Sequence, residues 1–124
     1  MALSILMVLL ISSSAGALAS SFVTTEDMRD CARRLERVQA ILKQAGPSAG
    51  KIVEAGCFRS DQAFDDFMHG YGGDDRPVRH YRVQLRGENA LVTEAASAAA
   101  CAATPLRQRE FCTQSRQAMK RPAK

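Results

Sequence analysis

The most regular pattern in the chain is an apolar stripe between residues 28 and 45. Apolar residues recur there at steps of three and four, which is typical of one face of an amphipathic helix, at Met28, Cys31, Leu35, Val38, Leu42 and Ala45. Thr24 and Asp27 have the spacing of a capping box at its start, and Gly46-Pro47 predicts its end. The heptad-like spacing also fits a dimeric coiled coil, but three heptads favour an ordinary core-facing helix.

Weaker patterns predict further helices along the rest of the chain. Residues 48–58 form a candidate short helix, and Ser60 is a candidate cap for a helix that runs to His69. Asn89 is a candidate cap for an alanine-rich helix over residues 90–103, and Thr104-Pro105 begins the last helix. Residues 70–77 read as a loop because they combine glycine, aspartate and proline.

One segment has the alternation of a strand. Arg79, Tyr81, Val83 and Leu85 alternate with polar residues, which predicts one short strand or hairpin near residues 78–86. Its only candidate partner is the segment 91–93, folded back across Gly87-Glu88-Asn89, and we favour the helix over this hairpin. No internal repeat is evident. The predicted fold is therefore mainly α, a small disulfide-stapled domain of four to five helices.

The first 19 residues differ from the remainder in being uncharged. Residues 3–11 are apolar apart from Ser4, a run too short to cross a hydrocarbon core of ~30 Å as a helix. This run and the small residues Ala17-Leu18-Ala19 predict a secretory signal peptide over residues 1–19, followed by a single exported domain over residues 20–124. The alternative is an uncleaved N-terminal anchor. The expected location is the periplasm or the extracellular medium, and no integral membrane segment is predicted.

Composition makes the cysteines important. Only 18 of the 105 residues from Ser20 onward are Leu, Ile, Val or Phe, about 17%, a proportion too low for a large core. An even number of cysteines in an exported chain predicts disulfides, here among Cys31, Cys57, Cys101 and Cys112. We favour Cys31–Cys57 with Cys101–Cys112, since each bond would close a helical hairpin. The nested pairing, Cys31–Cys112 with Cys57–Cys101, is the alternative.

The net charge of +4 is unevenly distributed. Residues 58–75 are acidic, whereas residues 76–87 and 105–124 are basic. The C-terminal basic residues form a candidate partner-binding surface, at Arg107, Arg109, Arg116, Lys120 and Arg121. Another exported protein is the expected partner, with an anionic envelope surface as the alternative. Nucleic acid is not expected, because exported proteins rarely meet it.

No motif for catalysis is present. The chain lacks a G-x-S-x-G elbow, a phosphate-binding glycine loop and an H-E-x-x-H pair. Asp65 and His69 lie four residues apart, and His80 could join them in a metal site, but solvated surface positions are the better interpretation. We therefore expect no enzyme activity, cofactor or metal, with a small metal-dependent hydrolase at Asp65, His69 and His80 as the alternative.

Two segments carry a resemblance to known proteins. Residues 23–31 are similar to the start of some periplasmic immunity proteins, and residues 90–101 are similar to their cysteine-ended last helix. The resemblance implies a toxin- or enzyme-neutralising role. The sequence as a whole predicts a small exported binding protein without catalytic activity, and an immunity or inhibitor protein is the more specific alternative.

Overall fold

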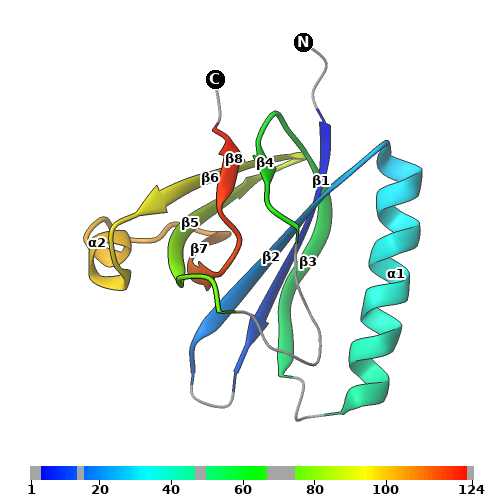
Figure 1. Ribbon diagram of the computed structural model, residues 1–124, viewed down its shortest axis with the longest axis horizontal. Coiled ribbons are helices and arrows are strands. Elements are labelled where there is room, and N and C mark those ends of the chain that lie inside the picture. The colour runs from blue at the N-terminus through cyan, green and yellow to red at the C-terminus, as the bar shows by residue number, and fades with distance from the viewer. Residues whose placement is uncertain (1–3, 14–15, 47–49, 67–74, 123–124) are drawn as a thin grey trace.

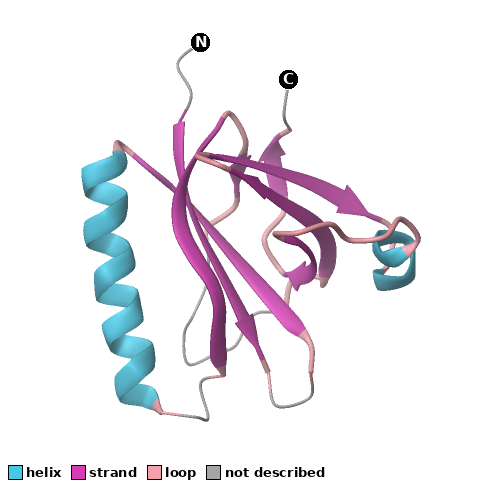
Figure 2. Ribbon diagram, turned by 180° about the vertical axis from the view of Figure 1, so that it is seen from behind, coloured by secondary structure: helices cyan, strands magenta, loops and turns pink. Residues whose placement is uncertain are grey.

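The chain forms a closed β-barrel in the computed structural model, which describes residues 4–13, 16–46, 50–66 and 75–122. Six strands close the barrel in the order β1 (Ser4–Ser12), β2 (Leu18–Thr25), β7 (Glu110–Ser115), β5 (Arg79–Arg86), β6 (Asn89–Ala95) and β3 (Lys51–Ser60). A separate two-stranded sheet pairs β4 (Ala63–Phe64) with β8 (Met119–Arg121). Helix α1 (Met28–Ala45) lies along one side of the barrel, and α2 (Ala98–Ala102) lies on the opposite side (Figures 1 and 2).

The prediction of a mainly α, all-helical domain is wrong. The predicted helix over 48–58 falls on β3, and the one over 60–69 contains β4, with residues 67–69 outside the described part of the chain. The predicted helix over 90–103 is β6 followed by the short α2, and the last predicted helix is replaced by β7 and β8. The helix over 28–45 is confirmed as α1, but the predicted capping box is wrong, because Asp27 is the N-cap and Thr24 lies in β2. The strand near 78–86 is confirmed as β5.

The error at β6 has a clear physical cause. Arg86 and Asn89 face each other at the end of the β5–β6 ladder, so Gly87 and Glu88 form a two-residue hairpin turn. Gly87 has φ of +57°, a conformation that such turns require and that glycine adopts at little cost. Pairing with β5 buries Val92, and this tertiary contact outweighs the preference of alanine for helix.

Strand β1 explains why residues 5–11 are continuously apolar. Leu6, Val8 and Leu10 belong to the core inside the barrel. Met7 and Leu9 alternate with them and are also buried, on the outer face that α1 covers. A strand buried on both faces needs no polar positions, and its apolar run resembles the hydrophobic segment of a signal peptide. Cleavage after Ala19 stays a prediction, and its consequence for β1 is taken up in the Discussion.

An aromatic cluster forms part of the core. The rings of Phe22 and Phe64 stack with centroids 4.3 Å apart, and Tyr81 meets both rings edge-on. The hydroxyl of Tyr81 donates a 2.6 Å hydrogen bond to the carbonyl oxygen of Gln117. Burial raises the pKa of Tyr81 to about 12. The tyrosine is therefore a neutral core residue whose single polar atom has a partner.

The barrel consists of two halves with the same topology, β1-β2-α1-β3 and β5-β6-α2-β7. In each half the first strand lies in the centre and pairs antiparallel with the other two. The registers correspond as well, because Met7 of β1 faces Cys57 just as Arg82 of β5 faces Cys112. The halves join through parallel contacts between β2 and β7 and between β3 and β6. The expectation of no internal repeat is therefore wrong at the level of structure.

A short sequence trace of the repeat follows each third strand. Cys57-x-x-Ser60-x-Gln62-Ala63 matches Cys112-x-x-Ser115-x-Gln117-Ala118. Both glutamines are buried, and each bridges the two halves of the barrel. Gln62 exchanges two hydrogen bonds with the backbone of Val92, and Gln117 does the same with Phe22. The backbone N–H of each glutamine also donates a hydrogen bond to the hydroxyl oxygen of the serine two residues earlier.

The disulfides occupy equivalent positions in the two halves. Cys31 of α1 is bonded to Cys57 of β3, and Cys101 of α2 is bonded to Cys112 of β7. The favoured pairing is therefore confirmed, but the helical hairpins on which it was based are absent from the described part of the chain. Each bond ties the first turns of a helix to a strand of the barrel, rather than closing a helical hairpin.

Replacement of either bridging glutamine is expected to destabilise the barrel strongly. Gln62→Ala or Gln117→Ala would leave a buried backbone N–H and C=O without partners, at a cost of about 2–4 kcal/mol in the free energy of unfolding. Urea denaturation measures the loss. Gln114→Ala, on a half-buried position of β7, is the control and should change stability much less. Equal losses for all three variants would contradict the bridging role.

Candidate binding groove

The two halves differ in what covers the outer face of the central strand. In the first half this face carries Met7 and Leu9, and the 18-residue α1 lies over it. The equivalent residues of β5 are Arg82 and Gln84, and α2 has only five residues. An open groove of about 490 Å³ remains in the second half, which we call the basic groove. Its lining includes Arg82, Arg86, Glu94, Cys101, Pro105 and Arg107.

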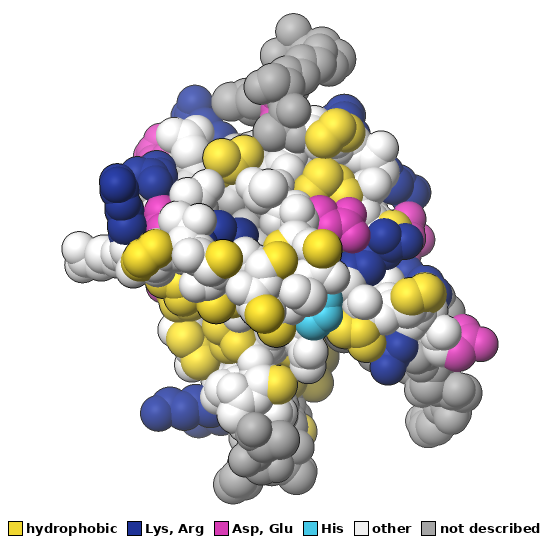
Figure 3. All heavy atoms as spheres, turned by 90° about the vertical axis from the view of Figure 1, so that its left-hand side faces the viewer, with side chains coloured by type: hydrophobic (Ala, Val, Ile, Leu, Met, Phe, Trp, Pro, Cys, Tyr) yellow, Lys and Arg dark blue, Asp and Glu magenta, His cyan; other side chains and the backbone are white. Residues whose placement is uncertain are grey.

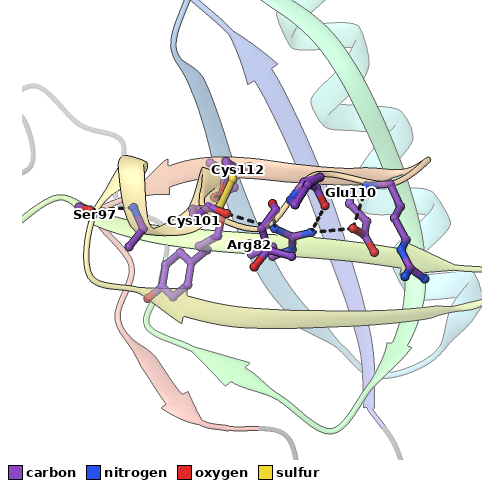
Figure 4. The surroundings of a disulfide bond; sticks show 12 residues. Arg82, Ser97, Cys101, Glu110 and Cys112 are labelled. Carbon is purple, nitrogen blue, oxygen red and sulfur yellow. Dashed lines mark hydrogen bonds and ion pairs between the residues drawn. A yellow bond between two sulfur atoms is a disulfide. The ribbon is translucent and has the colours of Figure 1, made fainter.

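Arg82 holds the floor of the basic groove together. Its guanidinium donates to the backbone carbonyl oxygens of Cys101, Thr104 and Pro105, at 3.1, 2.8 and 2.9 Å. It also bonds Glu110 Oε1 at 2.8 Å. Figure 4 shows Arg82 with Cys101 and Glu110, beside the Cys101–Cys112 disulfide. Arg82 therefore shapes the loop between α2 and β7, and its side chain is 15% exposed.

Glu110 is the buried counterion of this network. Its side chain is 3% exposed, and its two carboxylate oxygens accept four hydrogen bonds. Oε1 accepts from Arg82 and from the backbone N–H of Arg107, and Oε2 accepts from Gln84 and Arg86. A carboxylate with this many donors is held in its ionised form, so its role is to position the groove.

These contacts make the stability of the protein depend on Glu110 at low pH. The backbone N–H of Arg107 and the side chain of Gln84 lower the pKa of Glu110 from 4.5 to about 2. A lowered pKa in the folded state stabilises the protein fully above the unfolded value of 4.5, and that contribution is lost as the pH falls toward 2. Denaturant titrations should show this decline. Glu110→Gln should be less stable at neutral pH and should flatten the acid limb, and an unchanged acid limb would contradict the assignment.

Two arginines of the groove keep donors available. Arg86 makes one 2.8 Å bond to Glu110 Oε2, yet its side chain remains 63% exposed. Arg107 is exposed, and within the described part of the chain its guanidinium has no hydrogen bond or ion pair. Glu94, by contrast, is paired with Arg79 at 3.2 Å. The accessible charge of the basic groove is therefore positive.

The surface around the groove is mixed. Figure 3, seen from the α2 side, shows hydrophobic side chains across the middle of this face and basic side chains mostly around its margin. Leu91 and Leu106 are among the exposed large hydrophobic residues of the second half. Apolar positions with an arginine rim are typical of surfaces that bind proteins.

The structure disperses the predicted C-terminal basic surface. Arg107 lines the groove, but Arg109 lies 3.5 Å from Glu54 and over the ring of Phe58. Arg116 donates to the carbonyl oxygen of Arg76, and Arg121 donates to that of Asp61. Lys120 is exposed on β8. These residues share no helix, so of the predicted set only Arg107 lines the basic groove.

The structure shows only part of the candidate metal set. Asp65 Oδ2 accepts a hydrogen bond from the backbone N–H of Ala118 and lies 3.8 Å from Arg76. His80 is on the outer face of β5, and His69 lies outside the described residues. Among the described residues, no group of three or more His, Cys, Asp or Glu side chains is arranged to hold a metal ion.

Sequence reasoning did not find the residues that form the groove. Arg82, Gln84 and Arg86 are the polar positions of the predicted strand, and alternation does indicate that they share a face. Glu110 was assigned to a helix, so its contacts with all three could not be foreseen. The available signal was Arg82-x-Gln84-x-Arg86, three long polar side chains on one face with no acid in the segment.

Comparison of the chain with protein-family models, with curated proteins and with solved structures finds no match. Of the helices in the described ranges, none combines the length and apolar character needed to cross a membrane. The structure is a disulfide-bonded barrel of two ββαβ halves with a basic groove on the second half.

Proposed function

We propose that the protein is an exported, non-catalytic binding protein that acts on another exported protein through the basic groove. The observation that carries the proposal is the difference between the two halves. One central strand is covered by its own helix, and the other leaves a groove with accessible guanidinium groups. A surface of this kind is suited to a partner that covers the outer face of β5, as α1 covers the outer face of β1.

The chemistry of the groove supports binding over catalysis. A general base needs a carboxylate that can accept a proton near the working pH. Glu110 has all its oxygens engaged and a pKa of about 2. Glu94 forms an ion pair with Arg79. Both carboxylates of the groove are thus paired with arginine side chains, an arrangement that fixes the shape of the groove.

The two disulfides support an oxidising compartment, which accords with export. Within the proposed class, an immunity or inhibitor protein is the more specific alternative, and its support is the sequence resemblance of residues 23–31. The likeness of residues 90–101 to a last helix gives no support, because residues 89–95 form β6. Partner binding by such a protein would require no cofactor.

Affinity capture from the exported fraction of the native host tests the proposal. The bait is the full chain, compared with a groove variant, Arg86→Glu with Arg107→Glu. The matched control, Arg37→Glu with Lys43→Glu, changes the net charge equally at exposed positions of α1, on the opposite side of the barrel. A protein captured by the parent and the control but not by the groove variant is expected. Capture of the same protein by all three, or capture of anionic lipid alone, would contradict the proposal.

A further inference from the structure

We infer that the basic groove binds a carboxylate of an acidic segment of the partner, between Arg86 and Arg107. The inference rests on the proposed function and names the chemistry of its ligand. Arg86 and Arg107 belong to the β5–β6 hairpin side and the loop side of the groove, respectively, and both line it. A carboxylate placed between them would be bound from two sides.

The first argument is the supply of donors. A guanidinium carries five N–H groups in a planar fork that matches a carboxylate. Arg86 uses one guanidinium nitrogen in its bond to Glu110 Oε2. The Arg107 guanidinium has no hydrogen bond or ion pair in the described ranges. The backbone N–H of Arg107 is bonded to Glu110 Oε1 at 2.9 Å. The same buried carboxylate therefore fixes the positions from which both arginines reach into the groove.

The second argument is charge. The lining arginines Arg82, Arg86 and Arg107 are opposed by Glu94 and Glu110, which leaves a net charge of +1, and Glu94 is also paired with Arg79. Glu110 cannot neutralise Arg107 further, because its oxygens already accept four hydrogen bonds. An anionic ligand would balance the remaining charge, whereas a cationic one would be repelled.

The third argument is size and lining. A volume of about 490 Å³ lies within the ~300–1,000 Å³ range of sites for small ligands. It suits a few side chains and not an 18-residue helix such as α1. Ala95, Ala100 and Pro105 offer apolar contacts beside the arginines. This combination fits a short segment whose glutamate or aspartate has an apolar stem next to its carboxylate.

Titration with defined peptides tests the inference independently of the native partner. The probe is the end-capped peptide Ala-Ala-Glu-Ala-Ala, compared with Ala-Ala-Gln-Ala-Ala, added to the isotopically labelled full chain and followed by amide chemical shifts. We expect the glutamate peptide alone to shift signals of β5, β6 and the 103–109 loop, with a Kd on the order of millimolar. Binding should weaken as salt rises from ~0.1 M to ~1 M, because the screening length falls from ~10 Å to ~3 Å.

Variants decide whether the two arginines are responsible. Arg107→Glu is expected to weaken binding of the glutamate peptide about tenfold or more, and Arg86→Gln should weaken it in the same direction. Arg37→Glu, with the same charge change on α1, should bind like the parent. Equal shifts with both peptides, or parental binding by Arg107→Glu, would overturn the inference. If the glutamate peptide does not bind but the groove still captures a protein, this inference is wrong and the proposed function stands. If neither the peptide nor a protein binds at the groove, both are wrong.

Discussion

A chain that begins at Ser20 is expected not to form the barrel. Such a chain lacks β1, which pairs with β2 and β3 along its whole length. It also loses Leu6, Val8 and Leu10 from the core, and full burial of each contributes ~1.5–3 kcal/mol. This sum is comparable to a typical total stability of ~5–15 kcal/mol. Circular dichroism and amide shift dispersion should therefore show an unfolded chain.

A chain that begins at Ser4 is the control for this truncation. It removes only residues before β1 and should keep the spectra of the parent. The comparison bears directly on the predicted cleavage after Ala19, because a product that begins at Ser20 and this barrel cannot be the same folded molecule. N-terminal sequencing of the exported protein identifies which segment is kept. Native-like spectra for the Ser20 chain would show that β1 is dispensable.

Loss of both disulfides is expected to have the second-largest effect. In the chain-entropy model, the bond across 26 residues contributes about 3.5 kcal/mol and the bond across 11 residues about 2.8 kcal/mol. Their combined loss of about 6 kcal/mol would exceed the stability of a marginal domain. Reduction should lower the Tm strongly, and calorimetry in the presence and absence of a reductant measures the shift.

Two double variants separate the contributions of the bonds. Cys31→Ser with Cys57→Ser should cost more than Cys101→Ser with Cys112→Ser, because the first bond closes the longer loop. The second pair also anchors α2 beside the basic groove, so its loss should reduce partner binding as well. A Tm unaffected by reduction would contradict the structural role of both bonds.

The sequence was sufficient for elements that local pattern determines. Helix α1 has a full apolar stripe, a cap and a terminating glycine, and β5 alternates cleanly. The other strands depend on distant partners. Residues 51–60 have mixed burial on both faces, so their periodicity favours neither a helix nor a strand. Alanines in β6 favour a helix locally, and only the pairing with β5 makes them a strand.

The candidate site was even less accessible from sequence. Its central ion pair joins Arg82 and Glu110, which are 28 residues apart and become neighbours only through the β5–β7 register. Counting charges identified residues 105–124 as basic, yet a count cannot tell Arg107 in the groove from Arg121, which contacts the backbone of Asp61. The position of each arginine depends on the topology, and the topology was predicted wrongly.

The duplicated architecture also determines where the barrel opens during thermal fluctuation. Within each half the ladders are long, whereas between the halves the described strands pair at single parallel residue pairs, Ala19 with Gln114 and Arg59 with Asn89, which the bridging glutamines Gln62 and Gln117 reinforce. We expect the two junctions between the halves to open before the long ladders within each half. The basic groove lies wholly within residues 82–110 of the second half. The groove can therefore keep its shape when the junctions open. Ligand binding then depends on contacts within the second half, and barrel closure depends on contacts between the halves.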